Sequence, residues 1–211
     1  MTDKLSVWNG ALTAIGEREL ANDQENREPR YVLERLWNRD FIETILQMGQ
    51  WNFAIRSLKL EPDPNITTKF GYEHAYPQPE DYVRLVGFCE DEAFEYENKA
   101  YQVENGVFYT GRAEVYFRYV SNDPKYGTDF SKWPYNFTRF AEEYLGYCVT
   151  RRLTHSNPDT EQAEKRYKAA LKAAKNTDAM EQPPKTVPIS GWTHSRFGRR
   201  GDGGSRDRLL G

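Results

Sequence analysis

The side chains that most often carry chemistry are scattered along this chain of 211 residues. Its histidines, His74, His155 and His194, fall in an expected loop, at an expected helix end and near the C-terminus. None has a second histidine or a cysteine at the short spacing of a zinc site. Cys89 and Cys148 lie far apart and fit core thiols of a reducing compartment. With no glycine-rich phosphate loop and no nucleophile elbow, we expect no metal, no cofactor and no catalysis.

An acidic run, EDEAFEYE at residues 90–97, has five carboxylates among eight residues. It has two interpretations. One is a cation site, and the other is a solvated hairpin edge whose charge prevents pairing with a second sheet. The second is favoured.

The C-terminal stretch GRRGDGGSRDRLLG, residues 198–211, holds five glycines and four arginines. Alone it cannot bury enough apolar surface to compensate for its ordering entropy, so we expect order only against a partner. It is either a terminus without function, a single unit of an RNA-binding arginine–glycine segment, or a docking peptide. We favour the docking peptide. In the whole arm, residues 181–211, the apolar anchors would be Trp192, Phe197, Leu209 and Leu210, and the partner-pairing arginines Arg199, Arg200, Arg206 and Arg208.

Charge is divided unevenly along the chain. The formal net charge is −3, but residues from 181 onward carry six basic against three acidic side chains. Residues 1–180 carry 23 basic against 29 acidic side chains. An acidic body with a basic arm indicates an arm that binds an acidic protein surface or nucleic acid, and it argues against a body that grips DNA.

Composition bounds the class of protein. The length allows one domain, or one domain with an insertion. Aromatic residues make up 14% of the chain, which suits either a subunit buried against neighbours or a monomer with a large aromatic core. No apolar run is long enough for a signal peptide or a membrane span, so we expect cytosolic synthesis and no membrane partner.

Hydrophobic periodicity predicts four helices, at residues 3–17, 29–49, 131–156 and 158–177. The first has Leu5, Trp8, Leu12 and Ile15 on one side and ends near Gly16. The second begins at Pro29 and carries the apolar stripe Leu33, Trp37, Phe41, Ile45 and Met48.

Between the second and third predicted helices, the spacing of apolar residues changes from a helical period to a period of two residues, which is typical of strands. Residues 51–60 alternate, 83–88 and 114–120 are rich in strand-forming residues, and Asn105-Gly106 predicts a tight hairpin. The fold class is therefore α+β, mainly α: a bundle of about four helices with a small antiparallel β insertion and an extended C-terminal arm. The expected division is 1–54 and 129–180 for the helical body, 55–128 for the β insertion and 181–211 for the arm.

Three short motifs stand out: LSVWNGALTAIGE in the first helix, MGQWNFAIRSLKL after the second, and YPQPEDYVRLVGF at the start of a strand. They resemble the tail tubular protein A family, the head-to-tail adaptors of short-tailed bacteriophages. The resemblance covers roughly residues 5–180. It implies a virion protein that forms a ring of about twelve subunits. The ring would lie between the portal protein and the tail tube or nozzle, with DNA passing through the lumen.

The resemblance also implies that neighbouring subunits pack through the long helices. Trp37, Phe41, Trp133 and Phe137 are then ring-interface candidates, and the alternative is that all four belong to the core of one subunit. Two other function classes stay open: a nucleic-acid-binding protein that uses the basic arm, and an enzyme with an unrecognised site.

Overall fold

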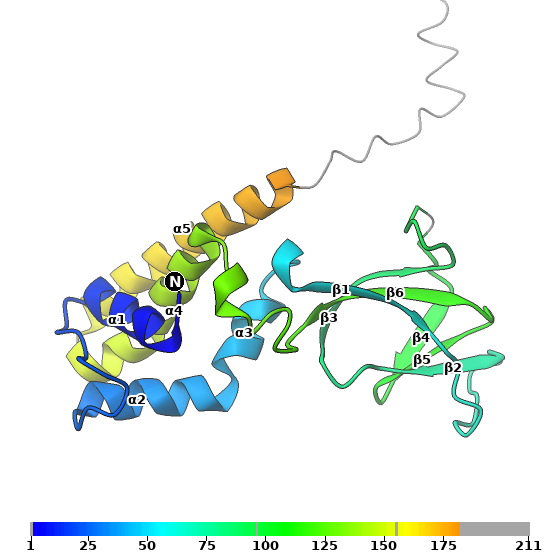
Figure 1. The fold of residues 1–211 in the computed structure, drawn as a ribbon, viewed down its shortest axis with the longest axis horizontal. Helices are drawn as coiled ribbons and strands as arrows, with labels where there is room; N and C mark the ends of the chain where they lie inside the picture. The colour runs from blue at the N-terminus through cyan, green and yellow to red at the C-terminus, as the bar shows by residue number, and fades with distance from the viewer. Residues whose placement is uncertain (1, 96, 155, 182–211) are drawn as a thin grey trace, which may run out of the picture. The chain divides into compact units, whose positions relative to one another are not determined.

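The computed structural model describes residues 2–95, 97–154 and 156–181 (Figure 1). Helices account for 46% and strands for 19% of the described residues, which confirms a mixed helix and strand fold. These residues belong to one compact unit. The predicted docking arm lies outside them from Gln182 onward.

The helices follow the local signals in the sequence. Asp3 caps the first helix by accepting a hydrogen bond from the Ser6 amide at 2.7 Å, and Gly16 follows its end with a φ of 78°. The third predicted helix begins later than expected, at Tyr135 after a short 3₁₀ turn, because a residue before proline disfavours the helical conformation and Trp133, before Pro134, is extended. The helices are α1 (Lys4–Ala14), α2 (Glu28–Leu36), α3 (Ile42–Gln47), α4 (Tyr135–Thr154) and α5 (Asn157–Glu181).

The helix predicted at 29–49 is interrupted by a π-helical turn at Trp37–Phe41, which separates α2 from α3. Leu33, Trp37, Phe41 and Ile45 recur every four residues, whereas an α-helix repeats every 3.6 residues or so. A regular helix would rotate this stripe away from the core. The wider π turn offsets that drift and keeps the stripe on the covered side.

Six strands form two antiparallel sheets. The first has the order β1 (Ile55–Leu60), β6 (Val115–Ser121), β3 (Tyr82–Cys89), and the second has the order β2 (His74–Pro77), β5 (Val107–Thr110), β4 (Tyr101–Glu104). The hairpin predicted at Asn105-Gly106 joins β4 to β5, and both residues have the positive φ that its turn needs. The strand β2, a four-residue edge strand that ends in proline, was not predicted from the sequence.

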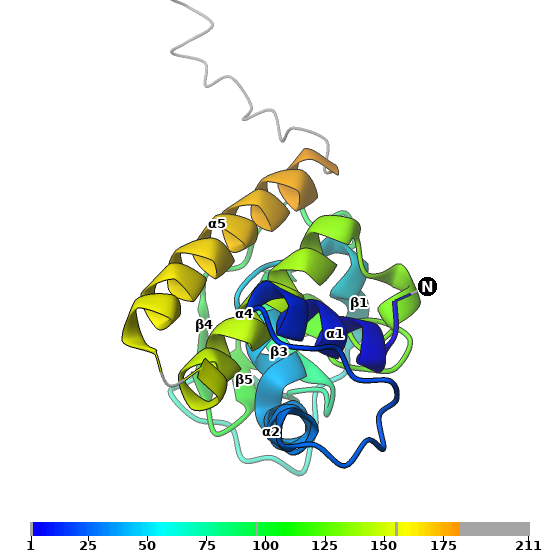
Figure 2. The ribbon, with the colours of Figure 1, turned by 90° about the vertical axis from the view of Figure 1, so that its left-hand side faces the viewer.

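Each part has its own aromatic core. In the β unit, residues 55–128, the rings of Tyr76, Phe88, Phe108 and Phe117 pack between the strands. In the helical part, α4 packs against both α1 and α5 (Figure 2). A side chain at Gly146 of α4 would meet the Ala11 carbonyl at 3.2 Å, so this glycine permits the close approach of α1.

The β unit is inserted into the helical part through two neighbouring strands. β1 leaves the helical part and β6 returns to it, and their ends are paired at Ile55 and Val120. Val120 and Val83 belong to the same hydrophobic cluster as the helices. Arg84 of β3 also donates a hydrogen bond to the Gln47 carbonyl at the end of α3, at 3.0 Å.

Candidate interaction surfaces

Three of the four predicted ring-interface residues lie in the core of the subunit itself. Phe41, Trp133 and Phe137 are 4%, 6% and 2% exposed, and they belong to one continuous cluster. They have almost no surface left for a neighbour, so these three residues fit the alternative, an intrasubunit core, and the interface stays a prediction for Trp37. The apolar residues at helical spacing show which side of the helix is buried. They do not show whether that side is buried by a neighbouring subunit or by the same chain.

The contacts of these residues explain their burial. Phe137 lies between Trp51 and Trp133, with ring centroids 4.8 Å from each. The Trp133 indole donates a hydrogen bond to the Gly127 carbonyl at 2.9 Å. Trp37 is partly exposed and stacks on Phe41 at 5.1 Å, so it remains the one candidate with surface to offer a neighbour.

The predicted arm contacts lie outside the described residues. They are Trp192, Phe197, Arg199, Arg200, Arg206, Arg208, Leu209 and Leu210. His155 and His194 also lie outside them. His74 lies in β2 beside the ring of Tyr76, at 6.4 Å between centroids.

In the acidic run at 90–97, the described carboxylates Glu90 and Asp91 have different partners. Glu90 pairs with Arg112 at 2.9 Å, and Asp91 accepts a hydrogen bond from the Glu95 amide at 2.8 Å. Within the described part of the chain, no cluster of three or more histidine, cysteine or carboxylate side chains could hold a metal ion.

The motif LSVWNGALTAIGE holds the segment after α1 in place through the side chain of Asn9. The Asn9 amide group donates to the Leu20 carbonyl at 3.0 Å, and its oxygen accepts from the Leu20 amide at 2.9 Å. This pair of hydrogen bonds holds residue 20, whose side chain is 3% exposed, against α1. The asparagine of this motif therefore has a structural role.

We predict that Asn9→Ala lowers the free energy of unfolding by about 1–3 kcal/mol, because it leaves two partly buried backbone groups of Leu20 without partners. Urea denaturation measures the change. Asn22→Ala is the matched control, because Asn22 bonds only the nearby Gln24 amide in an exposed turn. Equal effects of the two substitutions would contradict this role for Asn9.

The second motif joins the end of α5 to the start of β1. Asp178 accepts a hydrogen bond from the Asn52 amide at 2.8 Å, and its carbonyl accepts one from the Asn52 side chain at 2.7 Å. Burial raises the pKa of Asp178, and the bond from the Asn52 backbone opposes that rise. The neighbouring Trp51 is 1% exposed and donates to the Ile45 carbonyl at 3.1 Å.

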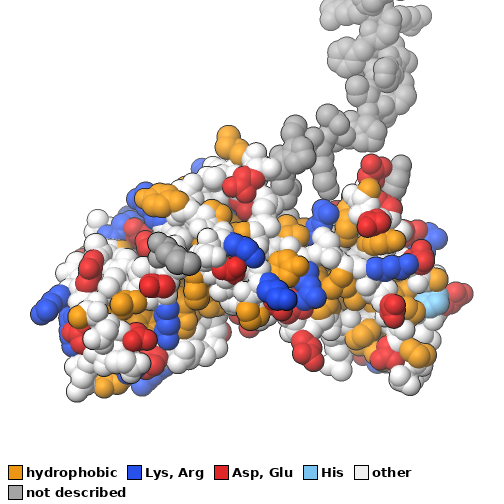
Figure 3. Space-filling model, viewed as in Figure 1, with side chains coloured by type: hydrophobic (Ala, Val, Ile, Leu, Met, Phe, Trp, Pro, Cys, Tyr) orange, Lys and Arg blue, Asp and Glu red, His pale blue; other side chains and the backbone are white. Residues whose placement is uncertain are grey.

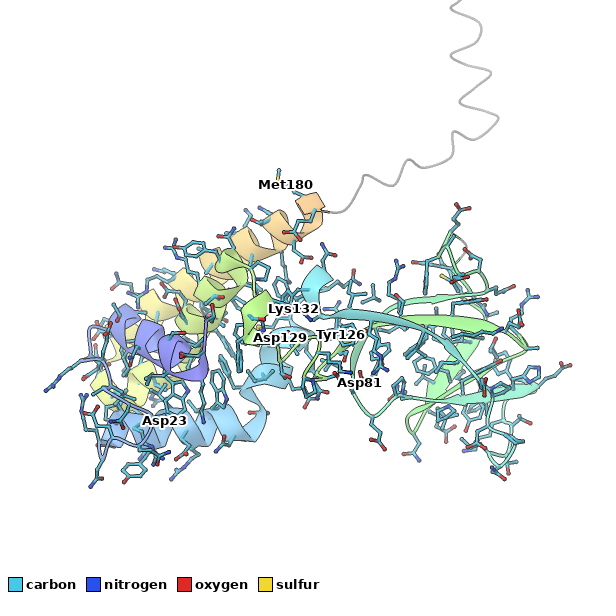
Figure 4. The ribbon with its side chains drawn as sticks, viewed as in Figure 1. Asp23, Asp81, Tyr126, Asp129, Lys132 and Met180 are labelled. Carbon is cyan, nitrogen blue, oxygen red and sulfur yellow. The ribbon has the colours of Figure 1, made fainter. Side chains whose placement is uncertain are left out.

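The third motif places Asp81 in a polar network at the start of β3 (Figure 4). Its carboxylate accepts hydrogen bonds from Arg56 of β1 and from Tyr119 of β6, both at 2.9 Å. Ser121 of β6 donates to the same carboxylate. The network therefore links the two strands that enter and leave the β unit.

Burial acts to raise the pKa of Asp81, but the bonds from Ser121, Tyr119 and Arg56 outweigh it, and the pKa is lowered. The pKa of Tyr119 is raised, first by burial and then by its bond to Asp81. Both shifts favour a charged carboxylate facing a neutral phenol, as a structural network requires.

One side of α5 carries a row of basic side chains. Lys165, Lys168, Lys172 and Lys175 are exposed and recur at intervals of three, four and three residues. Lys168 pairs with Glu164, one turn earlier. No carboxylate among the described residues pairs with Lys165, Lys172 or Lys175. We call these four lysines the basic face.

Three lysines elsewhere in the described residues are locally neutralised. Lys59, Lys69 and Lys132 pair with Glu114, Glu104 and Asp129 at 2.8, 2.9 and 3.2 Å. In Figure 3, blue side chains lie along the upper edge of the helical part, where Figure 1 places α5. The net negative charge of residues 1–180 as a whole conceals the basic face. The helical spacing of the lysines could have revealed it.

In a comparison with known proteins, no family model matches the chain, and no curated protein matches it significantly. In the described residues, every helix is too short or too polar to cross a bilayer.

Proposed function

We propose that this protein is a structural virion subunit that forms a head-to-tail adaptor ring in a bacteriophage. A ring of about twelve copies would lie between the portal protein and the tail tube or nozzle, and DNA would pass through its lumen. The protein would be assembled in the host cytoplasm, would remain in the connector of the virion, and would not act as an enzyme.

The observation that carries this proposal is the insertion of the β unit into the helical part through β1 and β6, whose ends are paired. An adaptor has to meet one component above the ring and a different one below it. A subunit with two separate aromatic cores, in a helical part and a β unit, can present a distinct surface to each.

The three family-like motifs support the proposal through their positions. Asn9 fixes the segment after α1, Asn52 joins α5 to β1, and Asp81 links β1 to β6. Each motif therefore has a structural role in the two-part subunit. A resemblance whose most specific motifs lie at these junctions supports the two-part architecture.

In this proposal the helical part is a bundle of four helices, and residues 181–211 form an extended arm that docks on the portal. Trp192 and Phe197 would be the anchors, Leu209 and Leu210 a terminal plug, and the arginines charge-assisted contacts. The test is to mix the full-length protein with purified portal rings of its phage and image the particles by negative stain. An added ring of density with an open lumen is expected. Portal rings left unchanged at saturating protein would refute the adaptor function.

We predict that deleting residues 187–211 abolishes attachment to portals and leaves a folded body, because buried aromatic anchors dominate binding energy in such interfaces. Replacing Arg199, Arg200, Arg206 and Arg208 by glutamine should weaken attachment less, since rim charges mainly affect rate and salt dependence. Co-sedimentation with portal rings measures both effects, and circular dichroism controls for folding. Normal attachment of the truncated protein would exclude the arm as the docking element.

A further inference from the structure

We infer that the basic face of α5 binds the phosphate backbone of double-stranded DNA without sequence preference. The binding itself follows from the surface of α5. Only its location, in the channel of a ring, rests on the proposed function.

The geometry of α5 exposes these lysines to a long ligand. Lys165 and Lys175 are ten residues apart, so the face extends along the helix by about 15 Å. The residues between the lysines on this side, Ala169, Ala173 and Asn176, are exposed and short. The opposite side, with Ala163 and Ala174 buried, packs onto the helical core. The ammonium groups therefore project beyond their neighbours.

The local charge favours a polyanion. Residues 165–177 contain five basic side chains and no acidic one, whereas Asp159, Glu161 and Glu164 precede them and Asp178 follows. At physiological salt the Debye length is about 8 Å, so a phosphate beside α5 responds to these lysines and little to distant carboxylates of the β unit. The negative charge of the whole body therefore does not prevent a local contact.

Lysine at these positions of α5 suits contact with the phosphate backbone of DNA better than recognition of its bases. Lysine is a compact charge on a flexible stem and makes no fixed bidentate contact, unlike arginine. Phosphate contacts of this kind position DNA but carry no sequence information. Three unpaired lysines per subunit give weak binding, which suits DNA that has to move past the protein.

The test is fluorescence anisotropy of a labelled duplex of mixed sequence, titrated with the full-length protein at several salt concentrations. The triple variant Lys165→Gln, Lys172→Gln, Lys175→Gln is compared with the wild type. The slope of log affinity against log salt should become shallower by about 2.7, which is about 0.9 for each lysine removed. Between about 50 and 200 mM salt the wild type should then lose about 40-fold more affinity than the variant.

The matched control is the triple variant Lys59→Gln, Lys69→Gln, Lys132→Gln, which loses the same charge from lysines that already have carboxylate partners. Its salt slope should match that of the wild type. The arm variant with its four arginines replaced by glutamine, measured in parallel, separates any contribution of the arm. Circular dichroism confirms that each variant is folded.

A wild-type slope for the α5 variant would overturn the inference. If that variant kept its DNA binding but lost self-association in sedimentation, the basic face would instead contact an acidic surface of a second copy. DNA binding through α5 by a protein that forms no ring on portals would refute the adaptor function and leave this inference standing.

Discussion

Phe137→Ala will lower the free energy of unfolding by about 3–5 kcal/mol. Phe137 is 2% exposed and packs within 4.8 Å, between ring centroids, of Trp51, Phe53 and Trp133. Its removal leaves a cavity among rigid aromatic rings that cannot easily collapse. Urea or thermal denaturation of the isolated protein measures the loss.

Tyr135→Ala is the matched control for Phe137→Ala. Tyr135 is an aromatic residue of the same helix, two positions earlier, and is 77% exposed. Its substitution should change the free energy of unfolding by no more than about 0.5 kcal/mol. If Phe137→Ala left the stability unchanged but prevented ring assembly on portals, Phe137 would be a ring contact and its place in the core would be wrong.

Asp81→Ala is expected to lower the free energy of unfolding by about 2–3 kcal/mol, because Tyr119, Ser121 and Arg56 lose their common acceptor. Since these donors lie on β1 and β6, the loss should weaken the junction between the β unit and the helical part. Asp23→Ala is the control, because that side chain is exposed on the connection between α1 and α2. Denaturant unfolding compares the two variants.

The same network predicts how stability depends on pH. The folded-state pKa of Asp81 is lowered, so its stabilising contribution is present above the unfolded value of about 3.9 and is lost as pH falls through the folded value. Asp81→Asn cannot ionise and lacks this dependence. The stability difference between wild type and Asp81→Asn should therefore be constant near neutral pH and shrink below about pH 4. A difference that does not change with pH would exclude the charged network.

Local sequence signals determined where most elements lie. The cap at Asp3, the glycine at Gly16 and the turn at Asn105-Gly106 act through neighbouring backbone groups, so the sequence contains their whole physical cause. The mixed fold and the position of the β unit followed from the change of hydrophobic period between residues 50 and 130. The edge strand β2 was not predicted, because the strand that pairs with it, β5, lies some thirty residues further along the chain.

Contacts between distant residues were decided by the tertiary structure. Arg56, Asp81 and Tyr119 come from three segments, and no local pattern indicates that they meet. The π turn arises because a stripe with four-residue spacing has to fit one core. The spacing of the α5 lysines was visible in the sequence, but only the packing of Ala163 and Ala174 against the core shows that the lysines face outward.

The sequence by itself determined that one side of each long helix is covered, since apolar side chains at helical spacing require burial. It could not determine whether Phe41, Trp133 and Phe137 are covered by a neighbour or by their own chain. The hydrophobic effect depends on the apolar area removed from water, and it is the same whether a neighbouring subunit or the same chain covers that area. Only the folded chain, which brings Trp51 and Phe53 onto α4, decides that these residues form the core of one subunit.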